Sequence, residues 1–172
     1  WGTSGCYPVN AISCHVSACP NHQTGRTTPF ATRGAVASLG ATGYELDLTK
    51  LSEEEKVQVR EQIENYKQID ELVLKGDLYR LADPFDGNYF CEMLVGKDKS
   101  KAYVVGERFR ADPCDHDRVL KLRGLDEGKT YAIRELNVTA SGAALMGAGL
   151  FCPRLPDCGS WVWHIEEVNK KG

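Results

Sequence analysis

The most regular pattern of apolar and polar residues lies between residues 51 and 75. Apolar side chains recur there at three- and four-residue spacing, which places them along one face of a helix. Ser52 and Glu55 have the spacing of a capping box at the start of that helix. Lys75 followed by Gly76 is typical of a helix end. The pattern predicts a helix that packs one apolar stripe against the rest of the protein. The residues of that stripe are Val59, Ile63, Tyr66, Ile69 and Val73.

Two short runs precede this helix, at residues 11–16 and 35–39, and each carries apolar or small residues on both faces. Such runs are typical of parallel strands that are covered on both sides. The stretch between them, residues 20–29, is rich in Pro, Gly and Thr and predicts a loop. Loops longer than the usual short connections are often functional, so this loop is a candidate for binding residues.

After Gly76 the pattern changes to short strand-like runs separated by turn signals such as Asp83-Pro84 and Asp86-Gly87. Partial alternation along residues 160–164 indicates strands with one buried face. Repeated short strands at this spacing predict an antiparallel β-sandwich. The predicted strands are residues 89–95, 102–109, 119–122, 130–133 and 161–165.

These patterns divide the chain near residue 83, with an α/β part over residues 1–82 and an all-β part over residues 83–172. Two strands and one helix are too few to close a core by themselves. We therefore expect residues 1–82 to be the end of a larger α/β domain, whose other elements come from upstream sequence or from another chain.

Composition narrows the class of protein. The 172 residues are 42% hydrophobic and 26% charged, as in soluble globular proteins. A net charge of −3 and four scattered His residues argue against a nucleic-acid partner. No apolar run approaches the roughly 20 residues that a membrane span needs. The sequence begins at Trp1 without a Met, so we expect the true N-terminus to lie upstream.

The seven Cys residues are an odd number spread over a long chain. Disulfide frameworks favour short chains with even counts, so we predict reduced thiols and a cytoplasmic location. Cys152 and Cys158 flank a Pro-containing loop and could pair if oxidised, but we expect both as thiols.

Residues 15–26, with the sequence HVSACPNHQTGR, resemble a segment near the end of the catalytic barrel of glycoside hydrolase family 36 α-galactosidases. The segments Gly43-Tyr44-Glu45-Leu46-Asp47-Leu48 and Leu122-Arg123-Gly124-Leu125 also resemble that family, and the resemblance covers essentially the whole chain. It implies the last strands and closing helix of a TIM-type barrel, followed by a C-terminal antiparallel β-sandwich.

The resemblance also implies a retaining hydrolase of terminal α-linked galactose, as in melibiose or raffinose-type sugars. Its two catalytic Asp residues would both lie upstream of Trp1, so we expect no catalytic residue in this chain and no activity from the chain alone. It implies no metal, no organic cofactor and a homo-oligomeric intact enzyme. The alternative is a carbohydrate-binding or structural β-sandwich module that supports oligomer contacts.

Loops that follow barrel strands build the active-site face of such barrels. His15, Asn21, His22 and Arg26 could therefore face a sugar-binding cleft in the intact enzyme, because planar polar groups hydrogen-bond sugar hydroxyls. The other interpretation is that these side chains brace the loop through hydrogen bonds to its backbone.

Two further clusters have a chemical and a structural interpretation. Glu45 and Asp47 have the spacing that puts two carboxylates on one strand face, but we favour the interpretation as an exposed strand end or turn leading to the helix. Residues 14–22 contain two Cys and two His, and residues 115–117 add hard ligands. No CxxC pair is present in either stretch, so we favour buried thiols and surface charges over a metal site.

Trp161 and Trp163 lie on one face of a predicted strand. Such a pair could form a platform that stacks on sugar rings, or it could belong to the core. Aromatic pairs of this kind are more often core residues, and we predict that role here.

Overall fold

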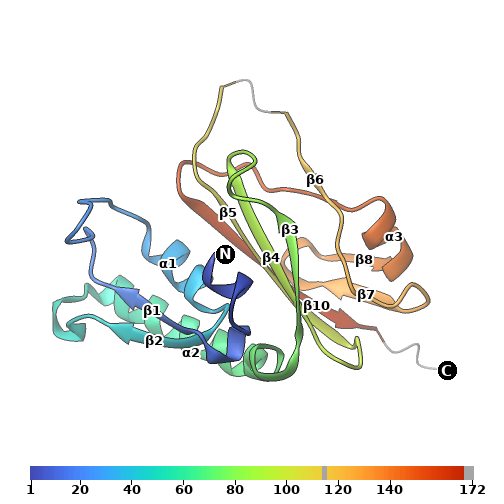
Figure 1. Ribbon diagram of the computed structural model, residues 1–172, viewed down its shortest axis with the longest axis horizontal. Coiled ribbons are helices and arrows are strands. Elements are labelled where there is room, and N and C mark those ends of the chain that lie inside the picture. Colours follow the sequence, from blue (N-terminus) through green and yellow to red (C-terminus); the bar gives the residue numbers. More distant parts are fainter. Residues whose placement is uncertain (114–115, 169–172) are drawn as a thin grey trace.

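The computed structural model describes residues 1–113 and 116–168. A six-stranded antiparallel sheet forms its centre, with helices and a small parallel sheet on one side and shorter elements on the other (Figure 1). In spatial order, the six strands are β3 (Asp77–Ala82), β4 (Tyr89–Val95), β5 (Lys101–Arg108), β10 (Gly159–Glu167), β7 (Thr130–Ile133) and β8 (Val138–Ser141).

Four shorter strands form two further sheets: β1 (Ser13–Ser17) pairs with β2 (Ala41–Glu45), and β6 (Val119–Leu120) pairs with β9 (Leu150–Phe151). The α-helices are α1 (Phe30–Ala37), α2 (Glu53–Lys75) and α3 (Gly142–Gly147). Single 3₁₀ turns are η1 (Thr3–Gly5), η2 (Val9–Ala11), η3 (Leu48–Lys50) and η4 (Arg134–Leu136). No helix in the described ranges has the length and apolar character needed to cross a membrane.

The N-terminal elements form a parallel β1–α1–β2 unit, in which His15 lies opposite Gly43. The predicted strand at residues 11–16 is present as β1, shifted by two residues at its start. The predicted strand at residues 35–39 is wrong, because this stretch contains the last turn of α1 and the turn after it. Phe30, Gly34 and Ala37 are buried at helical spacing, and a short run of small apolar residues does not distinguish the two structures.

Helix α2 confirms the prediction made from its apolar stripe and its caps. The Ser52 hydroxyl accepts a hydrogen bond from the Glu55 amide at 3.2 Å, and the Glu55 carboxylate accepts one from the Ser52 amide at 3.0 Å. Ile69 and Val73 are buried against the central sheet, whereas Ile63 is exposed. The stripe is therefore covered mainly along the C-terminal half of the helix.

The central sheet is buried on both faces, and every residue of β4 is buried. Side chains alternate between the two faces of a strand, so Cys91 and Met93 point to one cluster while Phe90 and Leu94 point to another. Helix α2 covers the second face, and residues 120–125 together with α3 cover the first (Figure 1). The strands predicted after Gly76 are all present. Strand β3, which the sequence pattern did not predict, pairs with β4 and begins the sheet at Asp77.

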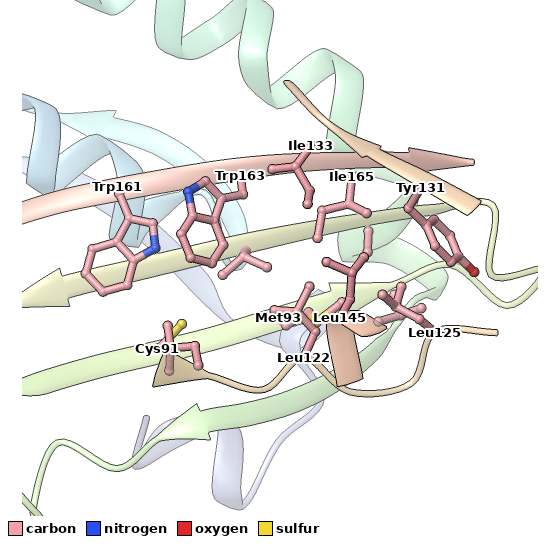
Figure 2. Close-up of a cluster of buried hydrophobic side chains, with 14 of the residues drawn as sticks. Cys91, Met93, Leu122, Leu125, Tyr131, Ile133, Leu145, Trp161, Trp163 and Ile165 are labelled. Carbon is pink, nitrogen blue, oxygen red and sulfur yellow. The ribbon is translucent and has the colours of Figure 1, made fainter. Parts of the chain in front are cut away.

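Trp161 and Trp163 belong to the core, as predicted. Their exposed fractions are 7% and 1%, and Figure 2 shows both rings among the buried apolar side chains of this cluster. Gly106 lies directly opposite Trp161, and a Cβ at that position would come within 2.0 Å of the indole ring. Because Gly106 has no side chain, the indole ring of Trp161 fits against the strand there. The ring is therefore buried and is not available as a platform for sugars.

Tyr103 of β5 joins the N-terminal elements to the central sheet. Its side chain is fully buried, and its hydroxyl lies 3.1 Å from the Ser38 hydroxyl, just after α1. The Asn65 amide of α2 donates a second hydrogen bond to the same hydroxyl at 3.0 Å. The Thr32 hydroxyl donates to the Cys158 carbonyl at 2.6 Å, so α1 is also tied to the start of β10. These bonds place α1 in a fixed position on the sheet.

Candidate functional site

The candidate site lies where β1 and β2 end, because the carboxyl ends of parallel strands meet at one edge of a sheet. The His15 side chain of β1 contacts the Glu45 carboxylate of β2 near this edge, with 2.6 Å between His15 Nε2 and Glu45 Oε2. Their side chains are 43% and 73% exposed, so the pair lies on the uncovered face of the two strands. After Ser17 the chain leaves β1 and enters the loop of residues 18–29.

Asn21 organises the tip of this loop. Its side-chain oxygen accepts hydrogen bonds from the backbone amides of Gln23 and Thr24, each at 3.0 Å, and from the Thr24 hydroxyl at 3.1 Å. Its backbone amide donates to the Arg26 carbonyl at 2.9 Å, and Gly25 supplies the left-handed conformation that the turn needs, with φ of +67°. The side-chain oxygen of Asn21 is therefore engaged within the loop.

A cavity of about 690 Å³ separates this loop from the end of β5. His15 and Arg26 both line it, so the structure brings together two of the four residues predicted from sequence. Asn21 and His22 do not line the cavity, and the His22 side chain is exposed.

The cavity contains a carboxyl group that sequence reasoning missed. Glu107 of β5 lines it, and burial raises the pKa of that carboxyl while the charge of Arg26 opposes the increase. The sequence pattern around Glu107 predicts only a strand. It does not indicate that Glu107 contacts the loop, because the two are far apart in sequence. Arg33 of α1 also lines the cavity and was not among the predicted site residues.

Glu45 and Asp47, the two carboxylates considered as a catalytic pair, have separate structural roles. Glu45 pairs with His15, whereas Asp47 caps η3 by accepting from the Thr49 amide at 3.0 Å and from the Thr49 hydroxyl at 2.6 Å. These hydrogen bonds lower the pKa of Asp47. A general acid needs a raised pKa, so Asp47 does not suit that role.

The cysteines show no ligand cluster in the part of the chain that the structure describes. Over residues 1–113 and 116–168, no three His, Cys, Asp or Glu side chains gather in a way that could hold a metal ion. Asp115, one of the residues considered as a ligand, lies outside the described ranges. Cys152 and Cys158 do not pair with each other.

Comparison with known sequences places these features in a class of enzymes, the glycoside hydrolases. The family model described as Melibiase matches residues 1–76, and the model of the glycosyl hydrolase family 36 C-terminal domain matches residues 89–165. The α-galactosidase AgaA of Geobacillus stearothermophilus is 43% identical over 171 residues, which is 99% of this chain and 23% of that protein. The bifunctional α-galactosidase/sucrose kinase AgaSK of Mediterraneibacter gnavus is 44% identical over 153 residues, which is 89% of this chain and 16% of that protein.

Solved structures agree with the sequence matches. The structure of AgaA from Geobacillus stearothermophilus in complex with raffinose has a TM-score of 0.93 at 43% identity, over 97% of this chain and 23% of that one. The α-galactosidase from Lactobacillus brevis has a TM-score of 0.94 at 34% identity, over 99% of this chain and 24% of that one. The chain belongs to glycoside hydrolase family 36 and corresponds to the C-terminal part of its α-galactosidases. It spans about a quarter of the length of these relatives.

Proposed function

We propose that this chain is the C-terminal part of an α-galactosidase, a retaining hydrolase that releases terminal α-linked galactose from melibiose or raffinose-type sugars. The observation that carries the proposal is the match of 99% of the chain to AgaA at 43% identity. The solved complex of AgaA with raffinose supports the choice of sugar.

Within that enzyme, we propose that β1, α1, β2 and α2 are the last two strand–helix units of a (β/α) barrel. Their parallel pairing and alternating order support this assignment. His15, Asn21, His22 and Arg26 would then lie at the end of the barrel where active sites form. The division into residues 1–82 and 83–172 stays a prediction, and the pairing of β3 with β4 extends the central sheet back to Asp77.

We also propose that the chain does not hydrolyse α-galactosides by itself. Retention requires two carboxyl groups roughly 5–5.5 Å apart, one as nucleophile and one as acid and base. Glu45, the last residue of β2, contacts His15, and Asp47, two residues further on, caps η3. The catalytic pair is expected from the residues that precede this part in the family.

An assay with p-nitrophenyl α-galactoside tests the proposal on two proteins, this chain and the chain joined to its upstream coding sequence. We expect turnover only from the longer protein, with α-galactose as the first product seen by NMR. The β-galactoside serves as the control substrate and should not be hydrolysed. Turnover by the purified chain alone would show that it contains its own catalytic carboxyl groups, and an inactive longer protein would overturn the assignment as an α-galactosidase.

The alternative of a sugar-binding module finds less support, because Trp161 and Trp163 are buried in the core. A supporting role for the sheet is consistent with the hydrogen bonds that tie α1 and α2 to Tyr103. Homo-oligomerisation and a cytoplasmic location stay predictions from the family resemblance and from the cysteine content.

A further inference from the structure

One guanidinium group joins the two ends of the loop of residues 18–29. Arg33 lies in the first turns of α1, and its Nη1 donates a hydrogen bond to the carbonyl of Ser17, the last residue of β1. Its Nε donates to the carbonyl of Thr28 at 3.2 Å, shortly before α1 begins. Ser17 precedes the loop and Thr28 lies near its end, so Arg33 holds both the exit from the strand and the approach to the helix.

Packing fixes the plane of this guanidinium. It lies 4.8 Å from the centre of the Phe30 ring, and that ring stacks on Tyr44 of β2 with 6.5 Å between centroids and 17° between planes. Phe30 is only 7% exposed, so the surface under the guanidinium is rigid. An Arg side chain can stack on a ring and donate in two directions at once, whereas the single ammonium of a Lys cannot reproduce that geometry.

Thr32, the residue before Arg33, fixes this part of α1 to the central sheet. Thr32 is 2% exposed and donates to the Cys158 carbonyl at 2.6 Å. Cys19 Sγ lies 3.7 Å from the Thr28 carbonyl, and residues 22–27 are exposed. The tip is held together by Asn21, whereas the two Arg33 bonds join the ends of the loop to α1.

We propose that Arg33 is a positioning residue for the sugar-facing loop of residues 18–29, an inference that rests on the proposed function. Arg33 acts through the loop backbone, and it holds the loop, with Arg26 at the cavity, in one orientation. Loss of the two bonds frees both ends of the loop, so the loop pivots at its ends and the hydrogen bonds within it open more often. Binding then requires the loop to be ordered again, so KM rises while the chemical step, carried out by other residues, changes little.

Arg33→Lys in the longer protein tests this role, with the exposed Arg60→Lys of α2 as the matched control. We expect KM for melibiose to rise about tenfold in Arg33→Lys with kcat changed less than about threefold, the pattern of lost ground-state binding. The Arg60 variant should match the wild type. A parallel loss of kcat without a change in KM would overturn the positioning role.

Hydrogen exchange on this chain gives a readout that does not depend on activity. In Arg33→Lys, the amides of residues 18–29 should exchange about tenfold faster while those of β4 and β5 stay unchanged, as expected for a local opening. Unchanged exchange in the loop would refute the inference even if KM rose. If the longer wild-type protein hydrolyses no α-galactoside, the proposed function fails, and the exchange result still decides whether Arg33 orders the loop.

Discussion

At the scale of single residues, Glu92 shows how much the surroundings of a charge matter. Its side chain is 3% exposed on β4, and it contacts Ser4 at 3.3 Å and the Arg80 guanidinium at 3.6 Å. Burial raises the pKa of this carboxyl, while the charge of Arg80 acts in the opposite direction. Because burial is the largest of these effects, the ionised form of Glu92 is held at a cost in free energy.

The raised pKa predicts a specific dependence of stability on pH. At a pH below the range where a free Glu titrates, Glu92 is protonated in both states and the folded protein keeps its full stability. As the pH rises through the raised pKa of Glu92 in the folded state, the free energy of unfolding decreases. Glu92→Gln removes the titration, so its free energy of unfolding relative to the wild type should increase between about pH 4 and pH 7. Urea unfolding across this range measures the difference.

Loss of the Arg80 contact changes the free energy of unfolding of Glu92→Gln by a constant amount. It does not change the direction in which the difference from the wild type varies with pH. Glu127→Gln, at an exposed position, is the control and should run parallel to the wild type. A difference between Glu92→Gln and the wild type that is the same at every pH would contradict the role of burial.

At the scale of elements, the sequence predicted those with a strong period or clear ends. Helix α2 and strands β4 and β7 lie where the pattern placed them. The run at residues 35–39 failed, because small apolar residues suit a helix turn and a strand alike and only the covering elements decide. Strand β3 was missed because four of its six residues are only half-buried at the sheet edge.

In the candidate site, too, the sequence indicated residues that are close together along the chain and missed those brought together by the fold. The local sequence of β1 and the loop after it was enough to select His15 and Arg26, which line the cavity. Glu107 could not be found, since it reaches the cavity from β5 through tertiary packing. Arg33 is close in sequence, but its hydrogen bonds to backbone carbonyls leave no mark in a residue pattern.

The capping box makes a prediction for α2 as an element. Ser52→Ala removes the hydrogen bond to the Glu55 amide, and such a loss costs about 1 kcal/mol of stability. Ser52→Asp keeps an acceptor at the same position and should retain most of the stability. Chemical denaturation followed by circular dichroism measures both variants. Equal stability of Ser52→Ala and the wild type would mean that the first turn of α2 is frayed.

At the scale of the whole molecule, the central sheet depends on the N-terminal elements. Phe90, Leu94, Tyr103 and Val105 are buried under α2 and its neighbours. Full burial of a large apolar side chain contributes about 1.5–3 kcal/mol. Four such residues therefore contribute an amount comparable to the roughly 5–15 kcal/mol that stabilises a whole domain.

A fragment of residues 77–172 should therefore fail to fold cooperatively, although it contains all the strands of the sheet. We expect it to bind the dye ANS and to show no sharp thermal transition by calorimetry, because the face under α2 is uncovered. Adding the peptide of residues 1–76 should restore the transition. A sharp transition from the fragment alone would show that the β part is self-sufficient.

The hydroxyl of Tyr103 has a consequence for the design of chimeric enzymes. Ser38 and Asn65 both meet it from the N-terminal side, so the two sides of this contact must be inherited together. A recombination point between α2 and β3 takes Ser38 and Asn65 from one parent and Tyr103 from the other. The two sides of the contact then come from different proteins. Crossovers before β1, by contrast, transfer the helices and the sheet as one block and leave this buried contact intact.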